Sequence, residues 1–328
     1  MQPQHTRRYQ SHDRECGQIG LNMIRILLVT LGLVCLGQTA VAQDAQPYEF
    51  PFQVDVYDLP IASNGVAYRL YVRAPLAAED RADGPPGIFY VLDGNYYFPA
   101  LAAGVFNTEH FGHTPNAYMV GIGYADLEEL DVSNHRTSDY TPTRFSPPDA
   151  NHPLPLHDYE GSGGAADFLR VLEEEIIPFV EARYALDNSE RGLVGKSYGG
   201  LFASYAFLQQ PDLFSQYVII SPSLWWDDFM LPHDERAMMQ MEADTHDMRL
   251  AQPTRIVFTA GSLEERLGMV TDVTRFTERL AARQDPNLDF TYRVLEGEQH
   301  ESMFPRAVMT SFRLLQGTLD WDDENSGG

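Results

Sequence analysis

The sequence predicts an α/β fold in which a mostly parallel central sheet is flanked by helices. Apolar, strand-like segments alternate with segments whose apolar residues recur every three or four positions. This alternation continues along most of the 328 residues, with no internal repeat and no long linker. Ligands of such sheets bind beyond the carboxyl ends of the strands, so we expect catalytic residues in the loops that follow strands.

The expected strands are short and apolar, and the expected helices are longer and amphipathic. The strands are 66–72, 87–92, 117–122, 192–194, 217–220, 255–259 and 290–294. The helices are 164–184, 199–209, 270–283 and 303–317. In the first helix Phe168, Leu172 and Ile176 recur at four-residue spacing, which predicts an apolar stripe packed against the sheet.

Residues 1–42 have the pattern of a secretory signal peptide preceded by a polar lead. Arg25 precedes an apolar run at 26–37, and the small residues of Ala40–Ala42 follow it. A membrane-spanning helix needs about 20 apolar residues, so this run is too short to be one.

Met23 fits the start of the signal peptide better than the first residue, and cleavage is predicted after Ala42. Residues 43–328 are then expected to form a single domain, periplasmic or secreted, without stable insertion into a membrane. Its 19 basic and 45 acidic residues give a charge of −26, which disfavours nucleic acid as a partner. Both cysteines, Cys16 and Cys35, lie in the segment removed, which excludes a disulfide or a thiolate metal site in the mature chain.

The segment around Ser197 carries the G-x-S-x-G pattern of a catalytic serine. It leaves a short apolar strand and enters a helix, which is the setting of a nucleophile elbow. Gly195, Lys196 and Ser197 could also end a phosphate-binding loop, but that motif requires a glycine where Glu190 stands. We therefore predict Ser197 as the nucleophile and place Lys196, the only lysine of the chain, beside the site or at its rim.

A serine nucleophile needs a base, and in α/β-hydrolases the order along the chain is serine, acid, histidine. Three histidines follow Ser197. His233 and His246 lie in an acidic, helix-prone stretch and are expected at the surface. His300 lies on the loop between the last expected strand and the last expected helix, so we predict it as the base.

The acid should follow the strand at 255–259. Glu264 and Glu265 both lie there, and neighbouring side chains point in different directions, so only one can orient His300. Asp272 is a third candidate, although it already lies in the helical pattern. The oxyanion hole needs two backbone amides: one is expected from Tyr198 and the other from the turn that follows the strand at 87–92.

These motifs resemble the putative esterase family of α/β-hydrolases (esterase D-like), and most closely its branch of enterobactin-type siderophore esterases. The matching pieces are Val91–Gly94, Arg136–Pro142, Gly195–Phe202, Ser221–Asp227, Gly261–Glu265 and His300–Ser302. They extend over most of the expected mature chain. The resemblance implies that Glu264 is the acid and that the second oxyanion amide is that of Asn95. The branch often has histidine where Lys196 stands, a difference outside the triad.

Three further residues are candidates for substrate binding. Trp225 and Trp226 follow a strand and could wall the acyl pocket, or one could lie in the core and one at the surface. Arg136 could form a buried pair with Asp139, or it could present a cation to an anionic substrate.

The predicted function is hydrolysis of carboxylic esters by a Ser–His–Glu triad, a chemistry that requires no metal or organic cofactor. The substrate is expected to be a small-molecule ester, either a siderophore trilactone (or its ferric complex) or a simpler ester. Two alternatives stay open. The same residues could transfer the acyl group to an alcohol or cleave acetyl or feruloyl esters, and a hydrolase fold could also serve as a non-catalytic binding protein.

Overall fold

The computed structural model describes residues 49–76, 86–126, 129–145, 161–186, 190–227 and 236–319. Contacts divide the chain into two units, residues 1–50 and residues 51–328, and all elements described below belong to the second. The expected signal peptide and its cleavage site lie outside the described residues.

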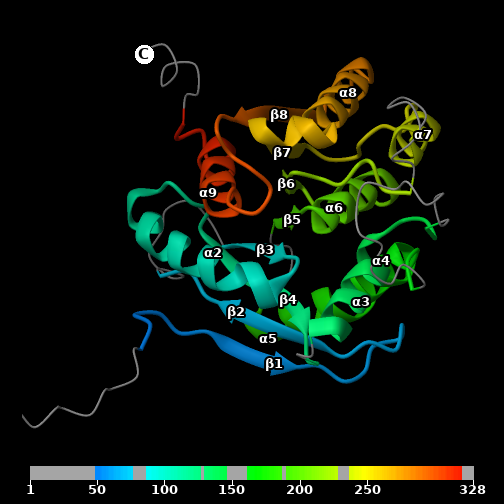
Figure 1. Ribbon diagram of the computed structural model, residues 1–328. Helices are drawn as coiled ribbons and strands as arrows, with labels where there is room; N and C mark the ends of the chain where they lie inside the picture. The colour runs from blue at the N-terminus through cyan, green and yellow to red at the C-terminus, as the bar shows by residue number, and fades with distance from the viewer. Residues whose placement is uncertain are drawn as a thin grey trace, which may run out of the picture. The chain divides into compact units, whose positions relative to one another are not determined.

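The core of the fold is one sheet with the strand order β1-β2-β4-β3-β5-β6-β7-β8 (Figure 1). Its strands are β1 (Asp55–Asp58), β2 (Tyr68–Arg73), β3 (Gly87–Val91), β4 (Ala117–Tyr124), β5 (Arg191–Lys196), β6 (Gln216–Ile220), β7 (Thr254–Gly261) and β8 (Leu288–Leu295). β2 runs antiparallel to β1 and β4, and the pairings from β4 through β8 are parallel. This is the α/β-hydrolase architecture that the alternating segments predict.

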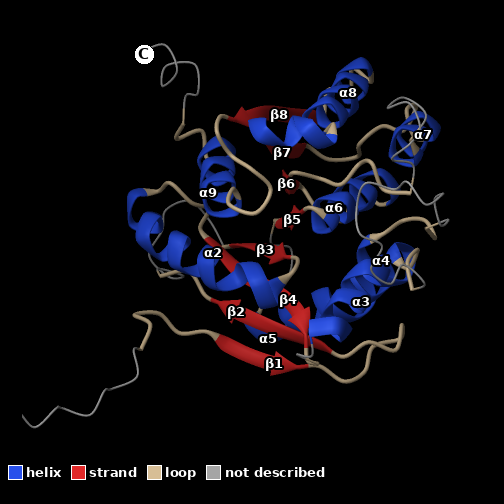
Figure 2. Cartoon of the chain, in the orientation of Figure 1, coloured by secondary structure: helices blue, strands red, loops and turns tan. Residues whose placement is uncertain are grey.

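Helices cover both faces of this sheet (Figure 2). They are α2 (Gly94–Thr108), α3 (Glu129–Tyr140), α4 (Ala165–Val171), α5 (Ile177–Tyr184), α6 (Tyr198–Gln209), α7 (Ala237–Asp244), α8 (Met269–Ala282) and α9 (Phe304–Leu315). In Figure 1, α2 and α9 lie to the left of the sheet and α4, α6 and α7 to the right. Neighbouring residues of β3 divide accordingly: Phe89 belongs to the core under α2 and α9, and Tyr90 to the core on the opposite face.

All seven expected strands and all four expected helices are present, within a few residues of the expected ends. The helix expected at 164–184 is one continuous run in which the π-helical turn η2 (Leu172–Ile176) joins α4 to α5. β1, α2, α3 and α7 are not among the expected elements, although the stretch that forms α7 is helix-prone. β1 is a short edge strand with two carboxylates, and α2 contains Pro99, which weakens its helical signal.

None of the helices in the described part of the chain is long and apolar enough to cross a membrane.

Candidate active site

Ser197 lies in a sharp turn between β5 and α6, and its backbone has φ 60° and ψ −119°. A non-glycine residue in this region is strained by about 1–3 kcal/mol, a cost that is typically found at functional positions. Gly195 shows why the turn needs a glycine, because a Cβ built there would lie 2.1 Å from the carbonyl oxygen of Gly199. The backbone N–H of Ser197 donates to the carbonyl of Ile220 at 3.0 Å, which ties the turn to β6. The elbow geometry therefore presents a half-buried serine hydroxyl above the amino terminus of α6.

His300 is hydrogen-bonded to Glu264, with 2.5 Å between His300 Nδ1 and Glu264 Oε1. His300 lies on the loop between β8 and α9 and its side chain is 26% exposed, whereas Glu264 is buried. A partly exposed histidine with a buried carboxylate bonded to Nδ1 is the arrangement that orients an imidazole for proton transfer at Nε2.

The Glu264 carboxylate accepts two further hydrogen bonds at its other oxygen. The backbone N–H of Gly261 and the hydroxyl of Ser221 each donate to Oε2 at 2.6 Å. Burial alone would raise the pKa of Glu264, but the hydrogen bonds from His300, Ser221 and Gly261 outweigh it and lower the pKa. The carboxylate is therefore ionised at neutral pH and can stabilise an imidazolium on His300.

Glu264 is thus the carboxylate that meets His300, and the two alternatives bind elsewhere. Glu265 is exposed and accepts hydrogen bonds from the backbone N–H (2.9 Å) and hydroxyl (2.5 Å) of Thr271 in the first turn of α8. Asp272 is buried in an ion pair with Arg236.

The other histidines do not compete with His300. His246 is 40% exposed at its side chain and lies beside Glu242, as expected of a surface residue. His233 lies outside the described residues.

Ser197 and His300 are linked through β6. The backbone of Ser197 is bonded to Ile220, the next residue is Ser221, and the Ser221 hydroxyl holds the carboxylate that holds His300. Within the described residues the Ser197 hydroxyl lies 3.4 Å from the hydroxyl of Ser223, and no hydrogen bond joins it directly to His300. Such contacts are commonly long before substrate binds and tighten in the reacting complex.

The two predicted oxyanion residues both lie in the first turn of a helix. Tyr198 is the first residue of α6, and Asn95 is the second residue of α2. The Asn95 side chain accepts from the backbone N–H of Tyr124 at 2.7 Å and donates to its carbonyl at 3.1 Å. The turn that carries the Asn95 amide is thereby fastened to the end of β4.

The family model described as "Putative esterase" matches residues 67–313, which is most of the chain. The chain belongs to this esterase family. It is an ester hydrolase with the α/β-hydrolase fold.

Its relatives include enzymes named for siderophores. The chain is 29% identical over 258 residues to a protein named ferri-bacillibactin esterase from Bacillus subtilis, covering 75% of this chain and 84% of the relative. It is 31% identical over 205 residues to a siderophore triacetylfusarinine C esterase from Aspergillus fumigatus, covering 61% of this chain and 65% of the relative. Among solved structures, a BES protein from Bacillus cereus is similar with a TM-score of 0.68 and 26% identity, covering 82% of this chain and 98% of the other.

Arg136 of this esterase does not pair with Asp139, so that expected pairing is wrong. Its Nε donates to Asp93 Oδ1 at 2.7 Å. Asp139 instead accepts hydrogen bonds from the buried hydroxyls of Tyr68 (2.6 Å) and Tyr124 (3.3 Å). Burial raises the pKa of Asp139 to about 7, against the opposing effect of these hydrogen bonds.

The two tryptophans are both buried, which corrects the expectation that one lies at the surface. Trp226 is 0% exposed, and its indole N–H donates to the carbonyl of Thr143 at 3.1 Å. Its ring packs edge-on against that of Tyr198, 5.2 Å away, so it supports the elbow. Trp225 is 7% exposed and lies 6.1 Å from the same tyrosine ring.

Lys196 is buried, not at the rim. Its ammonium lies 5.6 Å from the ring centroid of Tyr97, on the α2 side of the sheet. Burial, together with the nearby Arg136, lowers the pKa of Lys196 to about 8, although Glu264, Asp93 and Glu301 oppose this effect.

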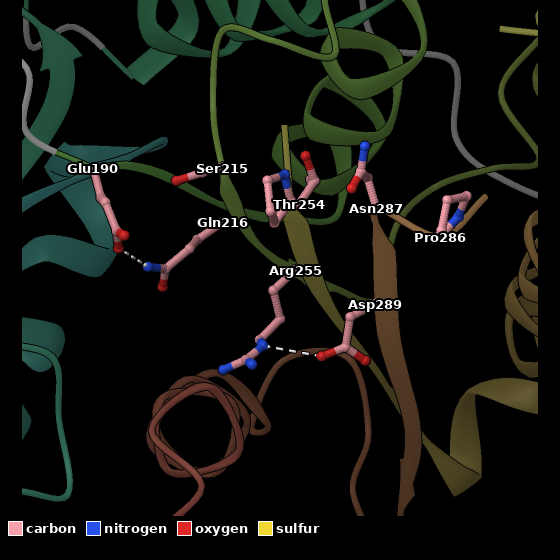
Figure 3. Close-up of a pocket in the computed structure, with 9 residues that line it drawn as sticks. Glu190, Ser215, Gln216, Thr254, Arg255, Pro286, Asn287 and Asp289 are labelled. Carbon is pink, nitrogen blue, oxygen red and sulfur yellow. Dashed lines mark hydrogen bonds and ion pairs between the residues drawn. The ribbon is translucent and has the colours of Figure 1, made fainter. Parts of the chain in front are cut away.

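A pocket of about 290 Å³ lies at the opposite edge of the sheet, where strands begin (Figure 3). Glu190 and Gln216 line it and are hydrogen-bonded at 2.9 Å, and Arg255 forms an ion pair with Asp289 at 3.1 Å. Because substrates of parallel sheets bind beyond the carboxyl ends of the strands, we do not place the ester in this pocket.

Among the described residues, no three His, Cys, Asp or Glu side chains gather where a metal ion could be held.

Sequence reasoning missed three residues of the site: Asp93, Tyr140 and Ser221. Each lies inside a segment that resembles the esterase family, but these segments do not reveal which partner each side chain meets. Tyr140 accepts a hydrogen bond from the backbone N–H of Asp93 at 3.0 Å, and Ser221 holds Glu264.

Proposed function

We propose that Ser197, His300 and Glu264 form a catalytic triad with which this esterase hydrolyses the ester bonds of siderophores. The observation that carries the proposal is the hydrogen bond from the His300 ring to the buried, ionised Glu264, on the same edge of the sheet as the strained Ser197. A general base oriented by a carboxylate activates a serine hydroxyl, and the strained turn presents that hydroxyl to the substrate.

In this mechanism the Ser197 oxygen attacks the ester carbonyl carbon while His300 Nε2 takes the hydroxyl proton. The backbone amides of Tyr198 and Asn95 donate to the oxyanion that forms. When the tetrahedral intermediate collapses, His300 returns the proton to the departing alcohol and an acyl-serine is left. Water then attacks this ester while His300 takes one of its protons. When the second tetrahedral intermediate collapses, His300 returns that proton to the Ser197 oxygen, which frees the carboxylic acid and regenerates the serine hydroxyl.

The assignment of a siderophore ester rests on the relatives, two of which are named for bacillibactin and triacetylfusarinine C. The side chain of Arg136 is 20% exposed and its guanidinium lies beside the Tyr198 ring, in a protein that is otherwise strongly acidic. It is available to an anionic substrate such as a ferric siderophore. Trp225, whose ring lies 6.1 Å from that of Tyr198, is proposed to border the acyl group.

An activated-serine probe tests the nucleophile. We expect a fluorophosphonate to label the wild-type protein and to fail on Ser197→Ala, and labelling that persists in the variant would refute the assignment.

Substrate class is tested by offering iron-free and ferric enterobactin, short aryl esters, and feruloyl or acetyl sugars. Turnover of the sugar esters alone would rule out a siderophore substrate. Formation of an acylated alcohol in place of the free acid would identify an acyltransferase.

We also propose that the enzyme acts outside the cytoplasm, after cleavage behind Ala42. The support is the signal-peptide pattern of the first 42 residues. Amino-terminal sequencing of the protein recovered from periplasm or culture medium should begin at Gln43. Recovery of the uncleaved chain from the cytoplasm would contradict the proposal.

A further inference from the structure

We infer that Arg136 is a positioning residue that joins the two segments whose backbone amides form the oxyanion hole. This role rests on the proposed function, because it concerns the hole assigned to Tyr198 and Asn95. It is distinct from the contact with an anionic substrate that Arg136 could also make.

The first segment is the turn that precedes α2, where Asp93 adopts a left-handed conformation with φ 55° and ψ 42°. Three polar groups of Asp93 are held. Its N–H donates to the Tyr140 hydroxyl at 3.0 Å, its carbonyl accepts from Tyr96 (2.9 Å) and Tyr97 (3.0 Å), and its Oδ1 accepts from Arg136 at 2.7 Å. Asp93 stands two residues before Asn95, so whatever holds Asp93 also directs the Asn95 amide.

Close packing leaves this turn little freedom to shift. A Cβ built on Gly94 would lie 2.8 Å from the backbone of Gly121 and of Ile122 in β4, so the turn can be this close only with glycine. The Asp93 side chain is 1% exposed, and its Oδ2 has no hydrogen-bond partner among the described residues. The bond from Arg136 is therefore the one strong side-chain interaction that the described residues provide to this buried carboxylate.

The second segment is the elbow, where the guanidinium of Arg136 lies over the ring of Tyr198. The guanidinium carbon lies 4.9 Å from the centroid of the Tyr198 ring. Trp226 packs against the edge of the same ring. Tyr198 supplies the other oxyanion amide, so a single planar side chain contacts both halves of the hole.

Arg136 and Tyr140 are one helical turn apart on α3, so both lie on the same face and reach Asp93 together. Arginine suits this place because its planar group can donate in its plane while stacking on a ring with its face. Lysine has a compact charge and cannot make both contacts in the same geometry.

The test is Arg136→Lys, which keeps the charge opposite Asp93. We expect kcat for an uncharged aryl ester to fall about 10- to 100-fold with KM within threefold, because small displacements of oxyanion donors act on the transition state. The affinity for an aryl boronic acid, whose adduct with the serine mimics the tetrahedral anion, should fall by the same factor as kcat/KM. Arg170→Lys is the control, since Arg170 pairs with Asp167 in solvent and should leave all values unchanged.

A second variant distinguishes loss of this interaction from misfolding. The double variant Asp93→Asn with Arg136→Gln replaces the ion pair with a neutral pair that can still hydrogen-bond, and it should recover part of the kcat lost in Arg136→Gln alone.

Several outcomes would overturn the inference. Unchanged kcat and boronate affinity in Arg136→Lys, or no recovery in the double variant, would overturn the positioning role alone. A rise in KM confined to a carboxylate-bearing ester would show that Arg136 serves only as a cation for substrate. If the wild-type protein hydrolysed no ester, the proposed function would fall and the positioning role with it.

Discussion

Glu264→Gln tests the acid of the triad more sharply than truncation, because it changes one carboxylate oxygen to NH₂ and leaves the size unchanged. The carboxylate serves three donors with two oxygens: His300 at Oε1, and Gly261 with Ser221 at Oε2. A glutamine has only one oxygen to offer them. The Ser221 hydroxyl can rotate to accept from the new NH₂, but the Gly261 N–H cannot.

The amide should therefore keep its oxygen on Gly261 and turn its NH₂ toward His300. The reverse orientation would leave the buried N–H of Gly261 facing another donor, at a cost of about 1–3 kcal/mol. With NH₂ against Nδ1, the imidazole must carry its proton on Nε2, and it can no longer accept the proton of Ser197. Together with the lost negative charge behind the imidazolium, we expect kcat to fall by about 10³- to 10⁴-fold.

Steady-state hydrolysis of a short aryl ester provides the measurement, with KM expected to stay within a few-fold. Glu265→Gln is the matched control, because the Glu265 carboxylate is exposed and its hydrogen bonds within the described residues go to Thr271. A Glu264→Gln enzyme that keeps a third or more of the wild-type kcat would refute the reasoning. An equal loss in Glu265→Gln would show that the effect does not come from the contact with His300.

Three further predictions concern the residues around the triad. Ser221→Ala removes one of the two donors to Glu264 Oε2, and we expect kcat to fall about tenfold while folding is preserved; an unchanged kcat would show that the hydroxyl does not position the acid. Because burial holds the pKa of Lys196 at about 8 when folded against 10.5 for a free lysine, the charged form destabilises the fold below pH 8. In urea titrations at pH 7, the free energy of unfolding of Lys196→Met should therefore be about 3 kcal/mol higher than that of the wild type, and this difference should close as the pH rises from 8 to 10.5. A pH-independent difference would contradict this. Burial raises the pKa of Asp139 to about 7 from 3.8, so its contribution favours folding at low pH and is lost as pH rises through 7. Between pH 5 and 8.5 the wild type should lose about 3 kcal/mol relative to Asp139→Asn in the same titration, and parallel curves for the two proteins would be the contrary result.

Much of the fold could be predicted because its signals are local. Apolar strands of five to eight residues and helices with a regular apolar stripe report on their own burial, and the structure contains each one expected. The exceptions have weak local signals. β1 is a short edge strand, and α3 is held by contacts such as those of Asp139 with Tyr68 and Tyr124, which come from distant parts of the chain.

The candidate site divides in the same way. Ser197 stands in a contiguous motif and His300 in a loop at the expected place after the last strand, so sequence and topology together single them out. The partners of Arg136, Trp225 and Trp226 could not be predicted from the sequence. A charged or aromatic residue in a loop or on a helix has several partners within reach, and only the packing of α3 against the turn before α2 decided for Asp93 over Asp139.

By itself the sequence determined the class of fold, the strand-to-helix turn that carries the proposed nucleophile Ser197, and the chain order of the proposed catalytic groups, because each depends on residues adjacent in the chain or on the alternation of strands and helices. The tertiary structure alone decided which carboxylate faces His300, that Lys196 is buried, and that Arg136 contacts both Asp93 and the ring of Tyr198. Those outcomes depend on the direction in which side chains leave neighbouring strands and helices. That direction is set by the packing of segments far apart in the chain, which no single stretch of sequence contains.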